Sequence, residues 1–529
     1  MNIADPTFEW FALSPVLAVL AAACLGVLAE AFLPQKPRYY AQLALAEIGL
    51  LGGFALLVWN WSAAAVSASG APQAVTGAKL AMGALVFDPP SYLFWGALLV
   101  FGALAVAVFG ERAMTGATAF AASVSAIPGS QAEADAIAAK REHTEVFPLA
   151  LFSLTGMMVF GSAGDLLTMF VALEVMSLPL YLLSGMGRRR RLFSQEAALK
   201  YFLLGSFASA FFLFGMALLY GYSGSFDFAV IDTSLATSEM NRGILLAGLG
   251  LMAVGLLFKM GVVPFQSWVP DVYAGAPTPV TGFMAICTKL AAAAGLARVF
   301  FVALGGERWS WQPVFAVLAI ATMAVGVILA LSQTDLKRLL AYSAISHAGF
   351  LLTAVVGAYQ FVPEGQLNSL GAIFYYLVAY GFATIPAFAI ITTLRDTSGG
   401  EATDLAKWSG LGKSNPLLAG IFSLLLLSFA GIPLTAGFIG KWAVFAAAWQ
   451  GGFWWLAITG IGFSLVAAYV YIKVIVAMFF GEPAEGVQLG QASMLTWLPI
   501  SLGAIGTLWL GLFPAQLMDL IAQAQVFVK

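Results

Sequence analysis

Charged side chains are scarce in this sequence: only 9% of its 529 residues are Asp, Glu, Lys or Arg, and 61% are hydrophobic. Water-soluble domains carry roughly 25% charged and 45–50% apolar residues. A water-soluble fold of this length would therefore expose apolar surface that it could not cover. The composition predicts that lipid is the solvent for much of the chain, and the net charge of −2 gives no sign of a nucleic-acid partner.

Cysteine and histidine are also rare, with two residues of each type. Cys24 and Cys287 lie inside apolar runs and are interpreted as packing residues, not as a disulfide or metal ligands, because a metal site needs clustered ligands. The sequence has no cysteine cluster for an iron–sulfur centre, no histidine pair for haem and no glycine-rich dinucleotide fingerprint. We therefore expect no metal and no bound cofactor in this chain.

Long apolar runs recur along the whole sequence. A membrane-spanning helix needs about 20 mostly apolar residues, and this rule predicts an all-α polytopic membrane protein with about 14 transmembrane helices. The runs are 12–34, 41–61, 91–109, 147–163, 165–186, 196–222, 243–264, 278–302, 311–331, 337–357, 368–394, 416–449, 453–480 and 493–514.

The basic residues of the loops predict the orientation, because cytoplasmic loops carry the excess of Lys and Arg. One set of alternating loops holds fourteen basic residues, and the opposite set, with both termini, holds four. Both termini should therefore face the periplasmic or outer side of a bacterial cytoplasmic (inner) membrane. The run Arg188–Arg191 is interpreted as a cytoplasmic anchor, where an anionic lipid can also bind. Residues 110–146 are predicted to form a cytoplasmic loop with room for a short surface helix.

Ionisable groups at membrane depth are costly and are functional candidates by default. Glu174, Lys259, Lys289 and Lys441 lie deep in apolar runs, and His347 also falls inside one. Exposed to hydrocarbon, each charged group would cost a few kcal/mol, so these residues should face one another or water. Buried ion pairs that only fix helix packing remain the alternative. His347 is equally compatible with a proton relay and with a satisfied core histidine.

Other ionisable residues have simpler interpretations. Lys200 follows Glu196 by one helical turn, which is a common structural pairing. Lys473 and Arg298 lie toward helix ends, where long side chains can reach the membrane surface. Lys200, Glu196 and Lys473 are kept as secondary candidates for proton transfer.

Two of the predicted helices carry breaks. Pro264 and later prolines follow Lys259, and Pro433 and Gly437 precede Lys441 within the overlong run 416–449. Proline removes a backbone donor and clashes with the preceding turn, and such breaks at membrane depth occur only where protein or a water-filled cavity surrounds them. We predict an interruption between about Gly431 and Gly440, with Lys441 beside it.

The breaks fall in predicted helices 7 and 12, which suggests two inverted five-helix repeats, helices 4–8 and 9–13. The predicted organisation is a three-helix segment, the cytoplasmic loop, the two repeats, and a C-terminal helix with its tail: 1–109, 110–146, 147–302, 311–480 and 493–529.

The segments around the lysines are similar to a known family. Three segments resemble the helix 7–8 and later motifs of the antiporter-like subunits of respiratory complex I, which are related to Mrp-type cation/proton antiporter subunits. These segments are FKMGVVPFQSWVPDVYAGAPTPVTGFMAICTKLAAAAGL, LKRLLAYSAISHAGFLL and FAGIPLTAGFIGKW. The resemblance covers roughly residues 145–480. Lysine in both helix 8 (Lys289) and helix 12 (Lys441) resembles the N-type subunits, since M-type subunits typically have glutamate in helix 12.

The resemblance implies the function and partners of the chain. It implies proton translocation driven by NADH:quinone oxidoreduction, with K-, M- and J-type membrane subunits as neighbours. NADH, FMN, Fe–S clusters and quinone would be bound in partner subunits. By position, Glu174 matches the helix 5 glutamate, and Lys259, Lys289 and Lys441 match the lysines of helices 7, 8 and 12. His347 occupies a place where the family often has a polar residue.

A mechanism follows from these residue types. At ~5 Å and an effective dielectric of ~20, the attraction between Glu174 and Lys259 would be ~3 kcal/mol, so moving the carboxylate could switch the lysine between holding and releasing a proton. Three alternatives stay open: a subunit of a stand-alone Mrp-type sodium/proton antiporter, a membrane subunit of a hydrogenase-type complex, and a passive structural subunit.

The predicted orientation can be tested by thiol labelling of the intact membrane. We expect the substitution Asn2→Cys or Val528→Cys to create a thiol that reacts with an impermeant reagent from the periplasmic side, and a cysteine introduced next to Arg190 to react only from the cytoplasm. The reverse labelling pattern would contradict the orientation and the numbering of the helices.

Overall fold

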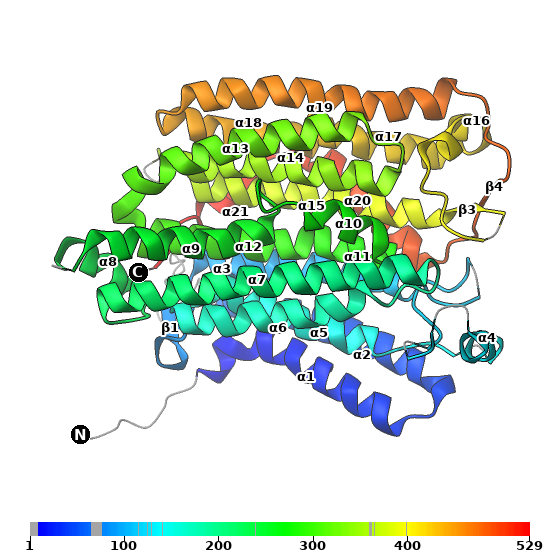
Figure 1. The fold of residues 1–529 in the computed structure, drawn as a ribbon, viewed down its shortest axis with the longest axis horizontal. Coiled ribbons are helices and arrows are strands. Elements are labelled where there is room, and N and C mark those ends of the chain that lie inside the picture. The colour runs from blue at the N-terminus through cyan, green and yellow to red at the C-terminus, as the bar shows by residue number, and fades with distance from the viewer. Residues whose placement is uncertain are drawn as a thin grey trace.

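The computed structural model describes residues 9–64, 77–114, 116–123, 125–127, 130–139, 141–237, 240–358, 362–363, 366–397 and 399–528. Three residues used in the predicted orientation or its test lie outside these ranges. They are the basic residues Lys140 and Lys529, and Asn2. The long helices run side by side along the longest axis of the molecule (Figure 1). The predicted all-α polytopic membrane fold is therefore confirmed.

The first half of the chain holds helices at each apolar run predicted there, with ends shifted by a few residues. Their bounds, with those of the three short helices α4, α8 and α10 that lie outside these runs, are α1 Trp10–Phe32, α2 Gln35–Ala64, α3 Pro89–Phe109, α4 Gln131–Ala138, α5 Val146–Ser162, α6 Leu166–Ser184, α7 Arg191–Ser223, α8 Phe228–Thr237, α9 Arg242–Met260 and α10 Trp268–Gly275. A continuous helical stretch follows, made of α11 Thr278–Phe283, the π-helix η2 Met284–Thr288, α12 Lys289–Arg298 and the π-helix η3 Val299–Ala303.

The second half repeats this pattern of long helices. The elements are α13 Arg308–Leu331, α14 Leu336–Gly357, α15 Ser369–Thr393, α16 Leu411–Ser414, α17 Pro416–Ala430, α18 Ala436–Gln450, α19 Trp454–Phe480, α20 Met494–Leu512 and α21 Ala515–Ala522. Short 3-10 turns are η1 Ala81–Gly83, η4 Gly305–Glu307 and η5 Leu405–Trp408. Within the described residues, 12 helical stretches are long and apolar enough to cross a membrane, and α5 and α17 are shorter apolar helices.

Two small two-stranded sheets mark the opposite ends of the helix bundle. β1 (Ala78–Leu80) pairs antiparallel with β2 (Leu85–Phe87), with Ala78 opposite Phe87. β3 (Leu394–Asp396) pairs antiparallel with β4 (Val487–Leu489), with Leu394 opposite Leu489. In Figure 1, β1 lies at the left end of the bundle and β3, β4 and α4 lie at the right end.

Both ends of the described chain lie at the left end of the bundle in Figure 1. Ala81 N–H donates to Glu9 Oε2 at 3.4 Å, and Val528 N–H donates to Asp88 Oδ2 at 3.1 Å, just before α3. The membrane side that this end faces stays a prediction from the loop charges.

Each of the two predicted breaks separates a pair of half-helices. α9 ends at Met260 and α17 ends at Ala430, and each is followed by a glycine in the left-handed conformation, Gly261 with φ of 75° and Gly431 with φ of 79°. The residue after each glycine donates its N–H to a carbonyl five residues back, at 3.0 Å and 3.1 Å, which is the Schellman cap. The chain therefore ends the two half-helices with the same local geometry.

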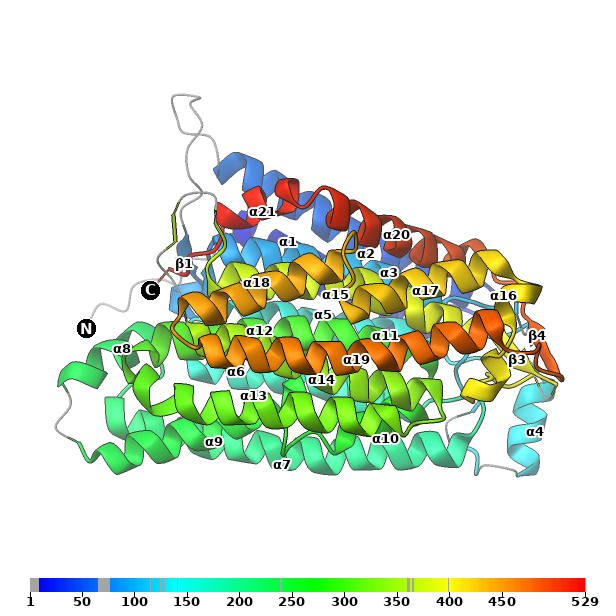
Figure 2. The ribbon, with the colours of Figure 1, turned by 90° about the horizontal axis from the view of Figure 1, so that it is seen from above.

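The prolines lie in the non-helical links that follow these caps. Pro264 lies between α9 and α10, and Pro433 lies between α17 and α18. Figure 2 shows α17 and α18 one after the other along the same direction. The predicted interruption of run 416–449 is thus confirmed, and it spans the five residues between Ala430 and Ala436.

Gly437 corrects the prediction, because it lies in the first turn of α18 and not in the break. A Cβ built on Gly437 would approach the Ser428 carbonyl oxygen to 1.8 Å. The residue is glycine because the start of α18 packs against the end of α17 with no room for a side chain.

The predicted cytoplasmic loop 110–146 is partly folded onto the bundle. It contains the two-turn helix α4, and Arg191 at the start of α7 forms an ion pair with Glu133 of α4 at 2.9 Å. Main-chain hydrogen bonds also join the loop to the segment after α6, with Ala121 N–H donating to Met186 O at 2.8 Å and Arg188 N–H to Ala119 O at 2.9 Å.

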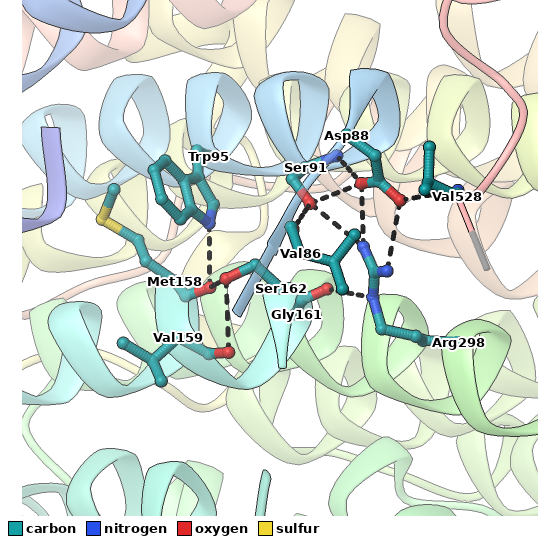
Figure 3. Close-up of polar contacts among 10 residues, drawn as sticks. All are labelled: Val86, Asp88, Ser91, Trp95, Met158, Val159, Gly161, Ser162, Arg298 and Val528. Carbon is teal, nitrogen blue, oxygen red and sulfur yellow. Dashed lines mark hydrogen bonds and ion pairs between the residues drawn. The ribbon is translucent and has the colours of Figure 1, made fainter. Parts of the chain in front are cut away.

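A buried ion pair lies near the end of the bundle that carries the chain ends, and it corrects the interpretation of Arg298. Arg298 is 1% exposed and Asp88 is 0% exposed, and Arg298 Nη2 lies 2.9 Å from Asp88 Oδ1. The guanidinium also donates to Gly161 O at 3.0 Å and to Ser91 Oγ at 3.0 Å (Figure 3). Arg298 therefore does not reach the membrane surface, because α3, α5 and the C-terminal tail enclose it.

Removing one partner of this pair should strongly destabilise the subunit, because it leaves a buried charge unpaired, at a cost of about 3–5 kcal/mol. We expect Arg298→Gln to lower the thermal midpoint of the detergent-solubilised complex and the yield of assembled complex. Arg242→Gln is the matched control, because Arg242 is 67% exposed in its pair with Glu307 and such pairs contribute about 0–1 kcal/mol. Equal midpoints for both variants would contradict a structural role of the buried pair.

Candidate functional site within the membrane

Lys259 lies in the last turn of α9, directly before the first break. It is buried, and its Nζ has no hydrogen-bond partner among the described residues. The ammonium instead lies 5.4 Å from the ring centre of Tyr181 on α6 and 5.2 Å from that of Tyr201 on α7. Cation–π contacts of this kind partly replace the lost hydration of a buried lysine.

Glu174 on α6 is half-buried, and its Oε1 also lacks a hydrogen-bond partner among the described residues. Because Lys259 Nζ has no hydrogen-bond partner among the described residues, Glu174 and Lys259 do not form a closed ion pair. In the structure, their carboxylate and amine are separated.

Lys289 begins α12, immediately after the π-helix η2. Its Nζ donates to Met260 O at 3.1 Å and to Ala344 O at 2.8 Å. Met260 ends α9 and neighbours Lys259 in the chain, whereas Ala344 belongs to α14. The Lys289 amine thus connects the first half of the bundle with the second.

His347 lies one turn beyond Ala344 on α14, and both of its ring nitrogens are satisfied. Nδ1 is hydrogen-bonded to the Tyr376 hydroxyl, and Nε2 lies 3.2 Å from the Tyr471 hydroxyl. His347 therefore lies one turn from the carbonyl that Lys289 bonds, within a hydrogen-bonded group of tyrosines.

Lys441 follows the second break, inside α18. Its Nζ donates to Ala430 O at 2.8 Å and to Ser464 Oγ at 2.7 Å. A cavity of about 10 Å³ lies between Lys441 and His347, and Tyr376 and Tyr380 also line it. This volume is about what one water molecule needs.

The two breaks supply equivalent carbonyl groups to two lysines. Met260 and Ala430 are the last residues of their half-helices, so their carbonyl groups have no partner within the helix. Lys289 binds the first carbonyl and Lys441 binds the second. The carbonyl end of a helix carries partial negative charge and favours a cation, which explains why lysines occur next to these breaks.

The secondary candidates lie elsewhere. Lys200 bonds Glu196 at 2.8 Å and Asp271 at 2.7 Å, and Asp271 also pairs with Arg338 at 3.4 Å. Lys473 is exposed on α19. The structure thus joins Lys200 and Glu196 in a charge network with α10 and leaves Lys473 outside the buried row.

Four tyrosines of the site escaped prediction: Tyr181 and Tyr201 beside Lys259, and Tyr376 and Tyr471 beside His347. In an apolar helix, a tyrosine looks like any other core aromatic residue. For Tyr376 and Tyr471, the signal that could have found them is the hydroxyl, since a buried tyrosine usually needs a polar partner.

Together these groups form one row in the order Glu174, Lys259, Lys289, His347 and Lys441, in which Glu174 is half-buried and the other four residues are buried. Each carries a titratable group, and each comes from a different helix: α6, α9, α12, α14 and α18. Such a row can hold and transfer protons. Within the part of the chain that the structure describes, no group of three or more His, Cys, Asp or Glu residues could hold a metal ion.

Comparison with known proteins places the chain in a family. The family model described as "NADH:quinone oxidoreductase/Mrp antiporter, TM" matches residues 163–467. The protein named NADH-quinone oxidoreductase subunit N from Nocardioides sp. is 48% identical over 537 residues, covering 100% of both chains. The protein of the same name from Cutibacterium acnes is 48% identical over 535 residues, covering 100% of this chain and 97% of that one.

Solved structures agree with this relationship. A chain of respiratory complex I from Thermus thermophilus matches with a TM-score of 0.75 and 30% identity, covering 96% of this chain and 100% of that one. A chain of the Mrp complex from Dietzia sp. shares the fold, with a TM-score of 0.77 at 23% identity, covering 98% of this chain and 96% of that one. The chain belongs to the family of antiporter-like, N-type membrane subunits of NADH:quinone oxidoreductase.

Proposed function

We propose that this chain translocates protons across the bacterial cytoplasmic membrane along the row Glu174, Lys259, Lys289, His347 and Lys441. One observation carries the proposal: the Lys289 amine bonds both Met260 O, in the residue after Lys259, and Ala344 O, one turn before His347 on α14. A purely structural set of ion pairs would match each buried lysine with a carboxylate. Lys289 and Lys441 bond main-chain carbonyls and a serine hydroxyl instead.

Glu174 and Lys259 form the switch in this proposal. An approaching carboxylate stabilises the ammonium form of Lys259, and a retreating one leaves the amine between two tyrosine rings, where the proton is released more easily. An attraction of ~3 kcal/mol at ~5 Å is large enough to reverse the protonation state of a buried lysine. In this proposal, the separated arrangement of Glu174 and Lys259 is the releasing state.

The remaining residues carry the proton into the second half of the bundle. Lys289 receives it beside Met260, and His347 passes it between Lys289 and Lys441. The cavity between His347 and Lys441 has room for about one water molecule, which could bridge the last step. The breaks beside Lys259 and Lys441 provide main-chain carbonyls that rearrange without exposing a helix to lipid.

The energy would come from partner subunits. We place NADH, FMN, Fe–S clusters and quinone there, with K-, M- and J-type membrane subunits as neighbours of this chain. The two inverted repeats would span residues 147–302 and 311–480, and both termini would face the periplasm. The matching Schellman caps of α9 and α17 support the repeats.

A subunit of a stand-alone Mrp-type sodium/proton antiporter is the second candidate, and it is the weaker one. The chain is 23% identical in sequence to the matching chain of the Mrp complex. It is 48% identical to a relative named as subunit N. Sodium uptake by vesicles in the absence of NADH would favour it, and copurification with the soluble NADH-oxidising subunits would argue against it.

Changes at the switch should stop proton pumping while the complex still assembles. Glu174→Gln removes the charge that supports the lysine, Lys259→Ala removes the proton carrier, and Lys259→Arg keeps a charge that cannot readily be lost. We expect each to lower NADH-driven proton pumping and coupled quinone reduction in inverted vesicles by about tenfold or more. NADH oxidation with an artificial acceptor should be largely spared.

The double variant and a control sharpen this test. Because the two residues act as one unit, Glu174→Gln/Lys259→Ala should be little worse than either single variant. Lys473→Gln removes an exposed lysine outside the row and should pump normally. An assembled complex with Lys259→Ala that pumps at the parent rate would show that Lys259 is structural.

His347 can be tested through its tyrosine partners. Tyr376→Phe and Tyr471→Phe each remove a hydroxyl that bonds the imidazole. We expect proton pumping to fall by about tenfold or more in each of these two variants. Tyr375→Phe is the matched control on the same helix, because the Tyr375 hydroxyl donates to Leu510 O at 2.7 Å, outside the row. If all three variants pump alike, His347 is a packing residue.

A further inference from the structure

A basic cavity lies on the seam between the two halves of the bundle, at the end opposite the chain termini. Its volume is about 410 Å³, within the usual range of small-molecule pockets, ~300–1,000 Å³. Its lining comes from the loop after α6, the link between α10 and α11, the start of α14 and the loop after β3. Residues Ala117–Ala119 of the long loop after α3 line one side. Ala119 and Phe120 pair with the segment after α6.

Positive charge dominates the lining of this cavity. Five cationic side chains and three carboxylates line it: Arg188, Arg189, Arg190, Lys337 and Arg395 against Glu111, Asp396 and Glu401. Burial lowers the pKa of Arg188. The neighbouring Glu142 charge raises this pKa, and the neighbouring Arg189 charge lowers it further. Cations crowded and partly desolvated in this way are stabilised by an anion.

The carboxylates of the lining are already bound to other groups. Glu111 Oε2 accepts hydrogen bonds from Ser493 Oγ and Thr496 Oγ1, both at 2.7 Å, and its Oε1 accepts one from Ala113 N–H at 2.6 Å. These bonds outweigh the effect of burial and lower the pKa of Glu111. Glu401 accepts a hydrogen bond from the Thr278 hydroxyl.

Asp396 is likewise bound. Its Oδ1 accepts from Gly400 N–H at 2.8 Å, and its Oδ2 lies 3.8 Å from Lys407 Nζ. Each of the three carboxylates is therefore already engaged with a hydrogen-bond or ion-pair partner.

Two polar groups of the lining lack partners. Thr118 is 3% exposed, and its Oγ1 has no hydrogen-bond partner among the described residues. Arg395 Nε also has none there, and Arg395 Nη2 lies 4.0 Å from Met114 Sδ, a weak acceptor. A buried hydroxyl and a guanidinium left unsatisfied are costly, and both belong to one cavity with excess positive charge.

We propose that this cavity is a binding site for a phosphate-bearing anion, held by Arg395, Thr118 and the neighbouring arginines. Arginine forks and hydroxyl groups match the several oxygens of a phosphate better than a monoatomic anion. The phosphate can belong to the headgroup of an anionic lipid, since the cavity opens at the end of the bundle with the basic loops, or to a soluble phosphate. The site is independent of the proton-translocating row.

Protection of Arg395 from an arginine-specific dicarbonyl reagent tests the site in the assembled complex. The complex is reconstituted in phosphatidylcholine nanodiscs, with chloride or inorganic phosphate at equal ionic strength, and in nanodiscs that also contain phosphatidylglycerol, with chloride only. Modification of Arg395 is followed by peptide mass spectrometry. We expect saturable protection, by phosphate if the ligand is soluble and by phosphatidylglycerol if it is a lipid headgroup.

Two variants decide whether the protection comes from this cavity. Thr118→Val removes one hydroxyl and should raise the half-protecting concentration about tenfold, the equivalent of one hydrogen bond to a charged group. Arg308→Gln removes an exposed arginine at the other end of the bundle and should change nothing. Three outcomes would each overturn the proposal. Arg395 could react equally in all three conditions, phosphate could slow the modification of Arg308 and Arg395 equally, or Thr118→Val could leave the protection unchanged.

Discussion

A helix that stops inside a membrane leaves main-chain carbonyls that lipid cannot satisfy, and this constraint shapes the centre of the molecule. α9 and α17 both stop there, and each offers its last carbonyl to a lysine from another helix. The lysine in turn needs an acceptor because it is buried in low dielectric. Break and cation therefore stabilise each other, and neither would persist alone. The proposed proton path is built from this mutual dependence.

The sequence predicted the parts of the fold that local composition determines. An apolar run long enough to cross a bilayer has to become a helix, because only a helix satisfies its backbone internally, and every predicted run coincides with helical structure. Lys259, Lys289 and Lys441 could be singled out for the same reason, since a charge in such a run is too costly to be incidental. Gly431, the predicted start of the second break, is the residue that caps α17.

Features that depend on contacts between distant segments escaped prediction. Asp88 and Arg298 are 210 residues apart in the chain, and neither sequence neighbourhood indicates the other, so Arg298 looked like a residue at a helix end. Tyr181 and Tyr201 look like core aromatics until their rings are placed around the Lys259 amine. Gly437 shows the same limitation, because the neighbouring α17 requires the absence of a side chain there.

The Asp88 carboxylate also has a consequence for biosynthesis. Its guanidinium partner is synthesised 210 residues later, and the Val528 amide that completes its hydrogen bonds is 440 residues away. While the chain is being inserted, Asp88 must remain hydrated or protonated at the edge of the bilayer. The N-terminal end of α3 can therefore reach its final packing only after Val528 has been synthesised, which makes this junction a late step in the maturation of the subunit.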